Sequence, residues 1–132
     1  MSQENVDTFM RLVDAYNRRD VDGFTAAFDP AGEWHPATVP AEGGGPYIGH
    51  DGLKKWWANV GDAFEEIHAT VDDIRDPDDR VIALGRLQGR FRSGVEFDTE
   101  VGWVVRFRDG LAVVGQAFFS HAEALEDAVL SE

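Results

Sequence analysis

The spacing of hydrophobic positions changes near the middle of the chain. Up to about residue 64, apolar residues recur three or four positions apart, which places them on one face of a helix. The pattern predicts three helices, over residues 3–18, from Val21 to Phe28 and from His50 to Phe64. Asp20 is a suitable N-cap for the second helix, and Asp29-Pro30 a suitable end. A short strand is expected over 32–36, and the glycine- and proline-rich stretch 37–46 predicts a loop.

The second half of the chain has the composition of strands. Four β-rich segments follow, over residues 67–75, 80–92, 95–108 and 111–119. Ser93-Gly94 and Asp109-Gly110 separate the last three, and glycine there supplies the positive φ of a tight hairpin turn. The connections are too short for a helical crossover, so the four strands are expected to pair antiparallel in sequence order. A last helix is expected over 122–130.

Helices followed by a long sheet are typical of an α+β architecture. Four glycines interrupt the strands, and such glycines often mark bends or bulges. They are Gly85, Gly89, Gly102 and Gly115. We therefore expect residues 1–132 to form a single domain, in which a strongly curved, mostly antiparallel sheet wraps around three helices as a cone with a cavity.

Composition narrows the classes of function. The 132 residues are 43% hydrophobic and 28% charged, typical of a soluble domain, and no apolar run approaches the ~20 residues of a membrane span. The polar N-terminus does not resemble a signal peptide, so a cytoplasmic location is expected. The absence of cysteine excludes disulfides and thiolate chemistry. A net charge of −13 without a basic stripe argues against a nucleic-acid partner.

Motifs for metals and phosphates are incomplete. The segment beginning at Asp76 resembles a calcium loop but has Val81 where that loop requires glycine. Gly43-Gly44-Gly45-Pro46 lacks the lysine of a phosphate-binding loop. The four histidines share no metal-ligand spacing. We expect neither a metal nor a cofactor.

Seven short runs, in their order and spacing, resemble a known family. They are Asp20-Val21-Asp22-Gly23-Phe24, Glu33-Trp34-His35-Pro36, Tyr47-Ile48-Gly49-His50-Asp51-Gly52, Trp56-Trp57, Gly85-Arg86-Leu87-Gln88-Gly89-Arg90, Phe107-Arg108-Asp109-Gly110 and Ser120-His121-Ala122-Glu123-Ala124-Leu125. Together they are similar to SnoaL-like members of the nuclear-transport-factor-2-like superfamily, over nearly the whole chain. That superfamily includes ketosteroid isomerases, polyketide cyclases and non-catalytic binding proteins. The resemblance implies an apolar pocket without a cofactor and a homodimer formed through the convex face of the sheet.

The resemblance also implies roles for single positions. His35 matches the position of the aspartate base of ketosteroid isomerases. Leu12 and Trp103 match the positions of the tyrosine and aspartate that form the isomerase oxyanion hole, and neither supplies that donor. Steroid isomerisation by that mechanism is therefore not expected.

The same register assigns one face of each long strand to the cavity. These residues are Leu84, Arg86, Gln88, Arg90, Thr99, Val101, Trp103, Val105, Gly115, Ala117 and Phe119. The opposite face of the first of these strands, with Val81, Ala83, Leu87 and Phe91, is equally apolar, so the sequence alone leaves the choice open. On the outer side, Val104, Arg106, Val114, Gln116 and Phe118 form a mixed surface suited to a second copy of the chain.

Three polar residues are candidates for catalysis. His35 and Glu33 lie two apart on one strand and so share a face, where histidine could act as a general base oriented by the carboxylate. Arg86, with Gln88, could stabilise a developing oxygen charge or a ligand carboxylate. The alternatives are a histidine bound to a backbone carbonyl and a structural ion pair of Arg86 with an acid.

Aromatic residues are candidates for binding a flat apolar ligand. They are Tyr16, Trp56, Trp57, Phe64, Trp103 and Phe119. Three functions stay open: an isomerase, cyclase or lyase acting on a hydrophobic carbonyl or polyketide-like substrate, a non-catalytic binding module for a small hydrophobic ligand, and a dimeric scaffold whose cavity is filled by its own side chains. Whether the protein is an enzyme is left undecided at this point.

Overall fold

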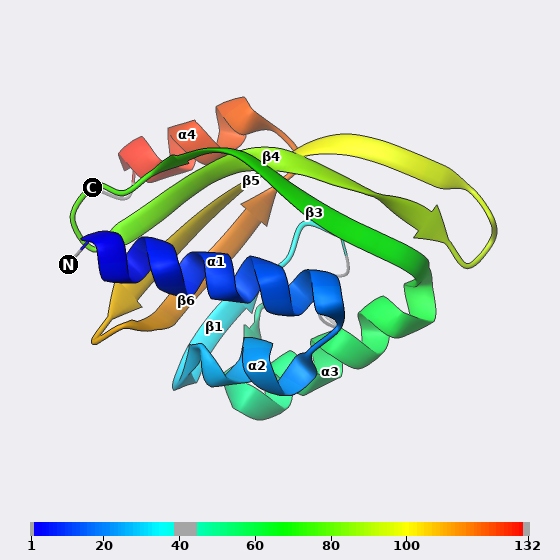
Figure 1. The fold of residues 1–132 in the computed structure, drawn as a ribbon, viewed down its shortest axis with the longest axis horizontal. Coiled ribbons are helices and arrows are strands. Elements are labelled where there is room, and N and C mark those ends of the chain that lie inside the picture. The colour runs from blue at the N-terminus through cyan, green and yellow to red at the C-terminus, as the bar shows by residue number, and fades with distance from the viewer. Residues whose placement is uncertain (1, 39–44, 131–132) are drawn as a thin grey trace.

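The structure, a computed structural model, describes residues 2–38 and 45–130 (Figure 1). The helices are α1 (Ser2–Arg18), α2 (Val21–Ala26), α3 (Gly49–Ala63) and α4 (His121–Leu130). The strands are β1 (Phe28–His35), β2 (Tyr47–Ile48), β3 (Phe64–Arg75), β4 (Arg80–Phe91), β5 (Glu96–Arg108) and β6 (Leu111–Phe118). No helix in the described ranges combines the length and hydrophobicity needed to cross a membrane.

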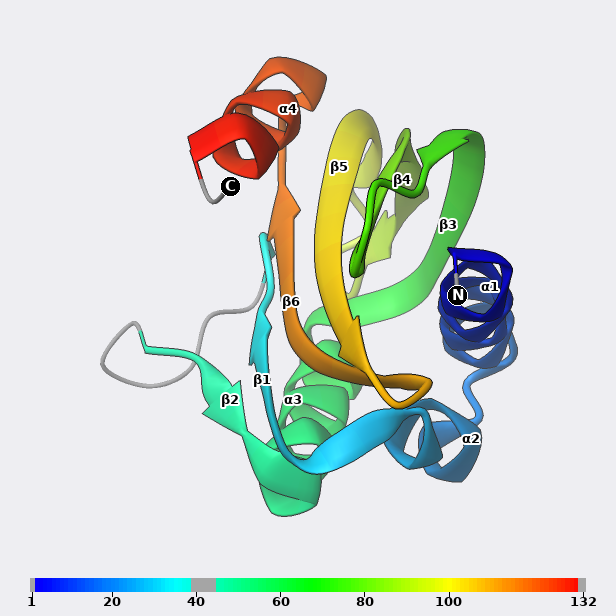
Figure 2. The same ribbon diagram turned by 90° about the vertical axis from the view of Figure 1, so that its left-hand side faces the viewer.

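The strands form one curved sheet with the order β2-β1-β6-β5-β4-β3. Strands β3 to β6 pair antiparallel in sequence order, whereas β1 pairs parallel to β6. The sheet is not closed into a barrel, since β2 and β3 are its two edges. Figures 1 and 2 show α1, α2 and α3 on the concave side and α4 on the other side. The predicted α+β class, the antiparallel pairing and the strong curvature are confirmed.

One bend of the sheet is located at Gly85. The pairing of β3 with β4 shifts between Val71 and Asp73, directly beside the Val71–Gly85 pair. A Cβ atom at Gly85 would collide with the backbone carbonyl of Thr70. Glycine therefore allows β3 to approach β4 closely where the sheet bends.

Several element boundaries differ from those expected, since β1 begins at Phe28, β3 begins at Phe64 and the short β2 was not expected. Asp20 caps α2 as expected, and its carboxylate accepts a hydrogen bond from the Gly23 amide at 3.0 Å. The expected end of this helix was wrong, since α2 ends at Ala26 and Asp29-Pro30 lies inside β1. The pairing of β1 with β6 is irregular between Phe28 and Glu33, so the missing N–H of the proline interrupts no regular ladder there. Residues 39–44 of the expected loop lie outside the described residues.

The main core fills the space between the concave face and α1, α2 and α3. A second, smaller core lies on the convex face, where Ile82, Leu84 and Val104 pack against Ala124 and Ala128 of α4. Gly102 faces Ala124 so closely that a Cβ atom would not fit. The expectation that the whole convex face is free for a second copy was therefore wrong, because α4 covers Val104.

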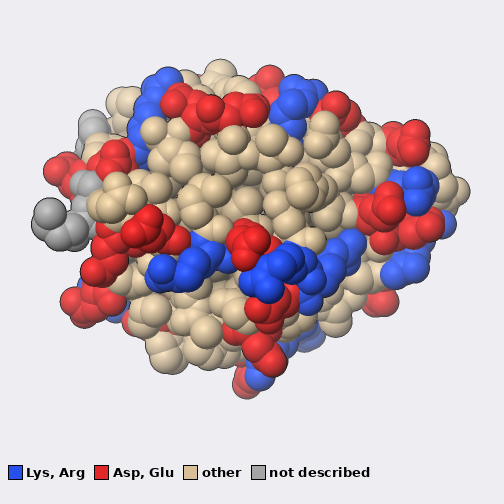
Figure 3. All heavy atoms as spheres, viewed as in Figure 1, with Lys and Arg blue, Asp and Glu red and all other residues tan. Residues whose placement is uncertain are grey.

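Charged side chains of both signs are interspersed on the face seen in Figure 1 (Figure 3). They surround an area of uncharged residues rather than forming one acidic field. On α1, for example, the Nε of Arg18 contacts the Oδ2 of Asp14 at 2.9 Å. Basic residues thus lie among the acidic ones on this side of the molecule, although the chain carries a net charge of −13.

Candidate functional site

A cavity of about 60 Å³ lies in the main core, partly open to solvent. The helices contribute side chains at helical spacing, and β1, β3, β4, β5 and β6 contribute residues of their concave faces. The lining residues are Phe9, Leu12, Val13, Tyr16, Phe24, Phe28, Trp34, Pro36, Ala37, Thr38, Trp56, Ala69, Leu87, Trp103, Val105 and Ala117. None of these residues carries a carboxylate, an imidazole, an amine or a guanidinium group.

Aromatic rings in mutual contact form much of the cavity wall. Tyr16 of α1 stacks on Trp56 of α3, with ring centroids 5.9 Å apart and planes inclined by 19°. Trp56 also meets Trp34 of β1 edge to face at 5.3 Å. On the other side, Phe9 of α1 contacts Trp103 of β5 at 6.0 Å. The wall is a surface suited to a flat apolar molecule.

The polar atoms of this wall lack hydrogen-bond partners. The Tyr16 side chain is only 9% exposed, and its hydroxyl makes no hydrogen bond among the described residues. Burial raises the pKa of this phenol above its ordinary value, and the charge of Arg19 offsets only part of that rise. The indole N–H groups of Trp34 and Trp56, and that of Trp57 behind them, are also buried without a partner in the described chain.

The predicted histidine and glutamate lie together but outside the cavity. The Nε2 of His35 is 3.4 Å from the Oε1 of Glu33, so the expected shared face is correct. Trp34 between them lines the cavity, and the side chains of a strand alternate between faces. His35 pairs with Gln116 and is 35% exposed on the convex side. The expected access of His35 to the interior was wrong.

Arg86 and Gln88 also lie on the convex face. Trp103 is opposite Ala83 and lines the cavity, so the odd-numbered residues of β4 face inward and the even-numbered ones outward. The Nε of Arg86 donates to Asp98 at 2.7 Å, and Gln88 contacts the other carboxylate oxygen at 3.4 Å. The Arg86 hydrogen bond lowers the pKa of the Asp98 carboxyl. The inward orientation expected for the β4 face was wrong, and the alternative face is the inner one.

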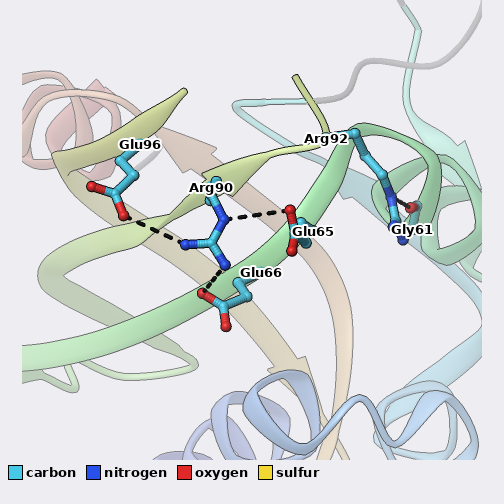
Figure 4. Close-up of polar contacts among 6 residues, drawn as sticks. All are labelled: Gly61, Glu65, Glu66, Arg90, Arg92 and Glu96. Atoms are coloured by element: carbon cyan, nitrogen blue, oxygen red, sulfur yellow. Dashed lines mark hydrogen bonds and ion pairs between the residues drawn. The ribbon is translucent and has the colours of Figure 1, made fainter. Parts of the chain in front are cut away.

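Leu84 and Arg90 of β4 were also expected to face the cavity, and both lie on the convex face instead. Leu84 packs under α4 on the convex side. Arg90 contacts Glu65, Glu66 and Glu96, from the strands on either side (Figure 4). Structural ion pairing, the alternative considered for Arg86, therefore describes both Arg86 and Arg90.

Half of the predicted ligand-binding aromatics line the cavity. Tyr16, Trp56 and Trp103 do, as do Val105 and Ala117 of the expected faces of β5 and β6. Trp57 is buried beside Tyr16 but does not line the cavity. Phe64 begins β3 and stacks on Phe91 with centroids 5.0 Å apart. Phe119 is 48% exposed after the end of β6, so its expected place in the cavity was wrong.

Some cavity residues had no predicted role in binding. Phe9 and Val13 share the helical spacing of Tyr16, so the apolar stripe of α1 contained the signal. Trp34 is an apolar residue between two polar neighbours on a strand, and this alternation predicts that it faces the interior. Ala37 and Thr38 lie in a segment predicted as a loop, for which spacing gives no orientation, and Pro36 was the end of the expected strand.

The model of the SnoaL-like domain family matches residues 9–114 of the chain. No curated protein sequence is significantly similar to this chain.

Several solved structures share the fold. A nuclear-transport-factor-2-like protein of unknown function from Burkholderia pseudomallei is 26% identical, with a TM-score of 0.81 over 93% of this chain and 95% of that one. TerC, crystallised with polyporic acid, is 20% identical with a TM-score of 0.78, over 93% of this chain and 96% of TerC. A protein proposed to be a SnoaL-like polyketide cyclase from Jannaschia is 18% identical with a TM-score of 0.76, over 94% and 90% of the two chains.

Proposed function

The chain belongs to the SnoaL-like domain family, and from this premise we propose that it is a binding module that holds one small, flat, apolar organic molecule in its cavity. The observation that carries the proposal is the cavity wall, which is built of stacked aromatic rings and contains no charged side chain among its lining residues. Binding to such a wall is favourable because it removes apolar surface of the ligand from water.

The size of the cavity limits the ligand. At about 60 Å³ it is smaller than the roughly 150 Å³ apolar cavity that accommodates benzene in an engineered protein. A single aromatic ring therefore requires a wall to move. Pro36, Ala37 and Thr38 are the lining residues outside helices and strands, and their displacement disturbs no regular hydrogen-bond ladder. We assign the mouth of the cavity to this segment.

Acid–base catalysis in the cavity has weaker support. An isomerase or cyclase needs a base within reach of the substrate proton. His35 and Glu33 are on the convex face, and the raised pKa of Tyr16 makes its phenol a poor base near neutral pH. The catalytic roles of His35, Glu33 and Arg86 stay predictions, and they do not form part of this proposal.

A nuclear magnetic resonance titration tests the binding proposal. The four tryptophan indole N–H groups give separate reporters, and three of them, on Trp34, Trp56 and Trp103, lie in the cavity wall. We expect isopropylbenzene to shift these three signals in a saturable way. Ala117→Leu fills the cavity and should abolish the shifts. Ala58→Leu adds the same atoms on the exposed side of α3 and should leave them unchanged. A saturable shift with neither isopropylbenzene nor a single-ring ketone of similar size, or equal shifts in both variants, would overturn the proposal.

A second copy of the chain is the partner we propose for the part of the convex face that α4 leaves open. Val114 and Gln116 of β6 are half-buried there, next to Glu33 and His35 of β1, whereas Phe118 packs against the small core under α4. A surface of mixed polarity is suited to a symmetric contact. The cytoplasmic location also stays a prediction.

A further inference from the structure

The polar atoms of the cavity wall are almost all hydrogen-bond donors. An indole N–H can donate but cannot accept. Trp34, Trp56 and Trp103 each line the cavity, are at least nine-tenths buried, and make no hydrogen bond through the indole among the described residues. The lining residues include no carboxylate and no side-chain amide that could accept from them. The wall is therefore short of acceptors.

Tyr16 is more buried than Thr38, the other residue of this wall that carries a hydroxyl. Its ring is fixed between Trp56 at 5.9 Å and Phe24 at 6.5 Å, with Trp57 at 5.5 Å on a third side. The hydroxyl thus has a defined position without a partner of its own in the described chain. Buried tyrosine hydroxyls usually find a hydrogen-bond partner, since leaving one unmade costs free energy.

The protonation state of Tyr16 fixes its role as a donor. Burial raises the pKa of the phenol, so the hydroxyl keeps its proton throughout the neutral range. Arg19, whose charge acts on this phenol, does not line the cavity. A ligand carboxylate would lose its hydration without meeting a cation, which is unfavourable.

We propose that Tyr16 is the polar anchor of the cavity and donates its hydroxyl proton in a hydrogen bond to an uncharged acceptor oxygen of an aromatic ligand. The site then prefers an aryl ketone or ether over a hydrocarbon of the same shape and over the matching carboxylate. This inference rests on the proposed binding function, because it requires that a ligand enters the cavity.

Three single-ring probes of similar size separate these chemistries. Acetophenone carries an acceptor oxygen, isopropylbenzene replaces it with a methyl group, and benzoate carries a charge. Dissociation constants are measured from the indole N–H signals of the wild-type protein. We expect acetophenone to bind about three- to tenfold more tightly than isopropylbenzene, the range of one net hydrogen bond. Benzoate should bind more weakly than either.

Two tyrosine variants assign the preference to one hydroxyl. Tyr16→Phe removes only that oxygen, and we expect it to abolish the preference, so that acetophenone and isopropylbenzene bind with equal affinity. Tyr47→Phe is the matched control, since the Tyr47 hydroxyl already accepts from Asn59 at 3.0 Å and does not line the cavity. It should retain the wild-type preference. Circular dichroism verifies that both variants fold.

The outcomes distinguish the two proposals. Equal binding of acetophenone and isopropylbenzene, benzoate binding as tightly as the ketone, or a preference that survives Tyr16→Phe would overturn the role of Tyr16 and leave the binding function intact. Failure of all three probes to bind would overturn the binding function, and the inference about Tyr16 with it.

Discussion

The side-chain amide of Asn17 pairs with both backbone groups of Ala69. Its Nδ2 donates to the Ala69 carbonyl at 2.9 Å, and its Oδ1 accepts from the Ala69 amide at 2.8 Å. Ala69 belongs to β3, an edge strand of the sheet. The contact attaches the end of α1 to that edge, one residue from Tyr16, and thereby holds the cavity wall together.

We predict that Asn17→Ala lowers the free energy of unfolding by about 1–3 kcal/mol, because two hydrogen bonds are lost and a partly buried backbone pair loses its partner. Asn17→Asp keeps the shape and the acceptor but loses the donor, so it should also destabilise. Urea unfolding measures both. Gln3→Ala, at an exposed position of the same helix, is the control and should have little effect. Equal stabilities of Asn17→Ala and Gln3→Ala would contradict the prediction.

The buried phenol of Tyr16 makes stability depend on alkaline pH. Its pKa in the folded chain lies above the unfolded value of about 10, so the unfolded chain releases this proton first as the pH rises. Its contribution to stability is complete below pH ~10 and is lost above it, at up to about 1.4 kcal/mol per pH unit. Urea unfolding between neutral and alkaline pH should show a shallower decline for Tyr16→Phe than for the wild type. Parallel curves would show that Tyr16 titrates normally.

His35 lies on the convex face, so we expect it to have no effect on ligand binding in the cavity. Because His35 and Glu33 are on the convex face, His35→Ala and Glu33→Gln should leave the affinity for isopropylbenzene unchanged. Both side chains are more than one-third exposed, so each change should cost less than about 1 kcal/mol of stability. The same titration and urea unfolding test this. A loss of isopropylbenzene affinity in His35→Ala would contradict this prediction and show that His35 takes part in binding.

Local signals in the sequence predicted the meander correctly. The turns after β4 and β5 each contain a glycine with positive φ, 95° at Gly94 and 79° at Gly110, as the hairpin patterns required. The cap at Asp20 was equally local, because a side chain and an amide three residues later suffice to form it. Such features depend only on neighbouring residues, so they can be predicted from the sequence without knowledge of the rest of the fold.

The orientation of β4 was not readable in this way. Val81 and Ala83 face the main core, while Ile82 and Leu84 pack under α4. A strand buried on both faces has no alternation of apolar and polar residues, so its pattern cannot show which side is the interior. For β1, the two-residue spacing of Glu33 and His35 fixed a shared face but not its direction. That depended on how Trp34 packs against Trp56.

The open part of the convex face predicts an oligomeric state. We expect sedimentation at micromolar concentration to show twice the chain mass of 14.6 kDa. Val114→Glu places a charge in the proposed contact and should give the single-chain mass. Thr70→Glu adds the same charge at an exposed position of β3 and should leave the dimer intact. A wild-type protein that sediments only as a single chain would exclude this interface.

Arg90 connects three strands at one end of the sheet. Its guanidinium contacts Glu65 at 3.4 Å, Glu66 at 3.2 Å and Glu96 at 3.5 Å, which belong to β3 and β5 (Figure 4). Beside it, the Nε of Arg92 donates to the Gly61 carbonyl at 3.0 Å and joins this end of the sheet to α3. The three carboxylates raise the pKa of Arg90, most strongly through the Glu65 hydrogen bond. Without the guanidinium, three like charges would remain close together.

We predict that Arg90→Gln lowers the melting temperature at low ionic strength, and that added salt recovers part of the loss because it screens the repulsion among the three glutamates. Arg75→Gln is the matched control, since Arg75 contacts one carboxylate, Asp73, at 3.2 Å. Its effect should be smaller and less dependent on salt, as is usual for an isolated exposed pair. Thermal unfolding of both variants at low and high salt measures the difference. If Arg90→Gln loses no more than Arg75→Gln at low salt, then Arg90 does not hold the strands together.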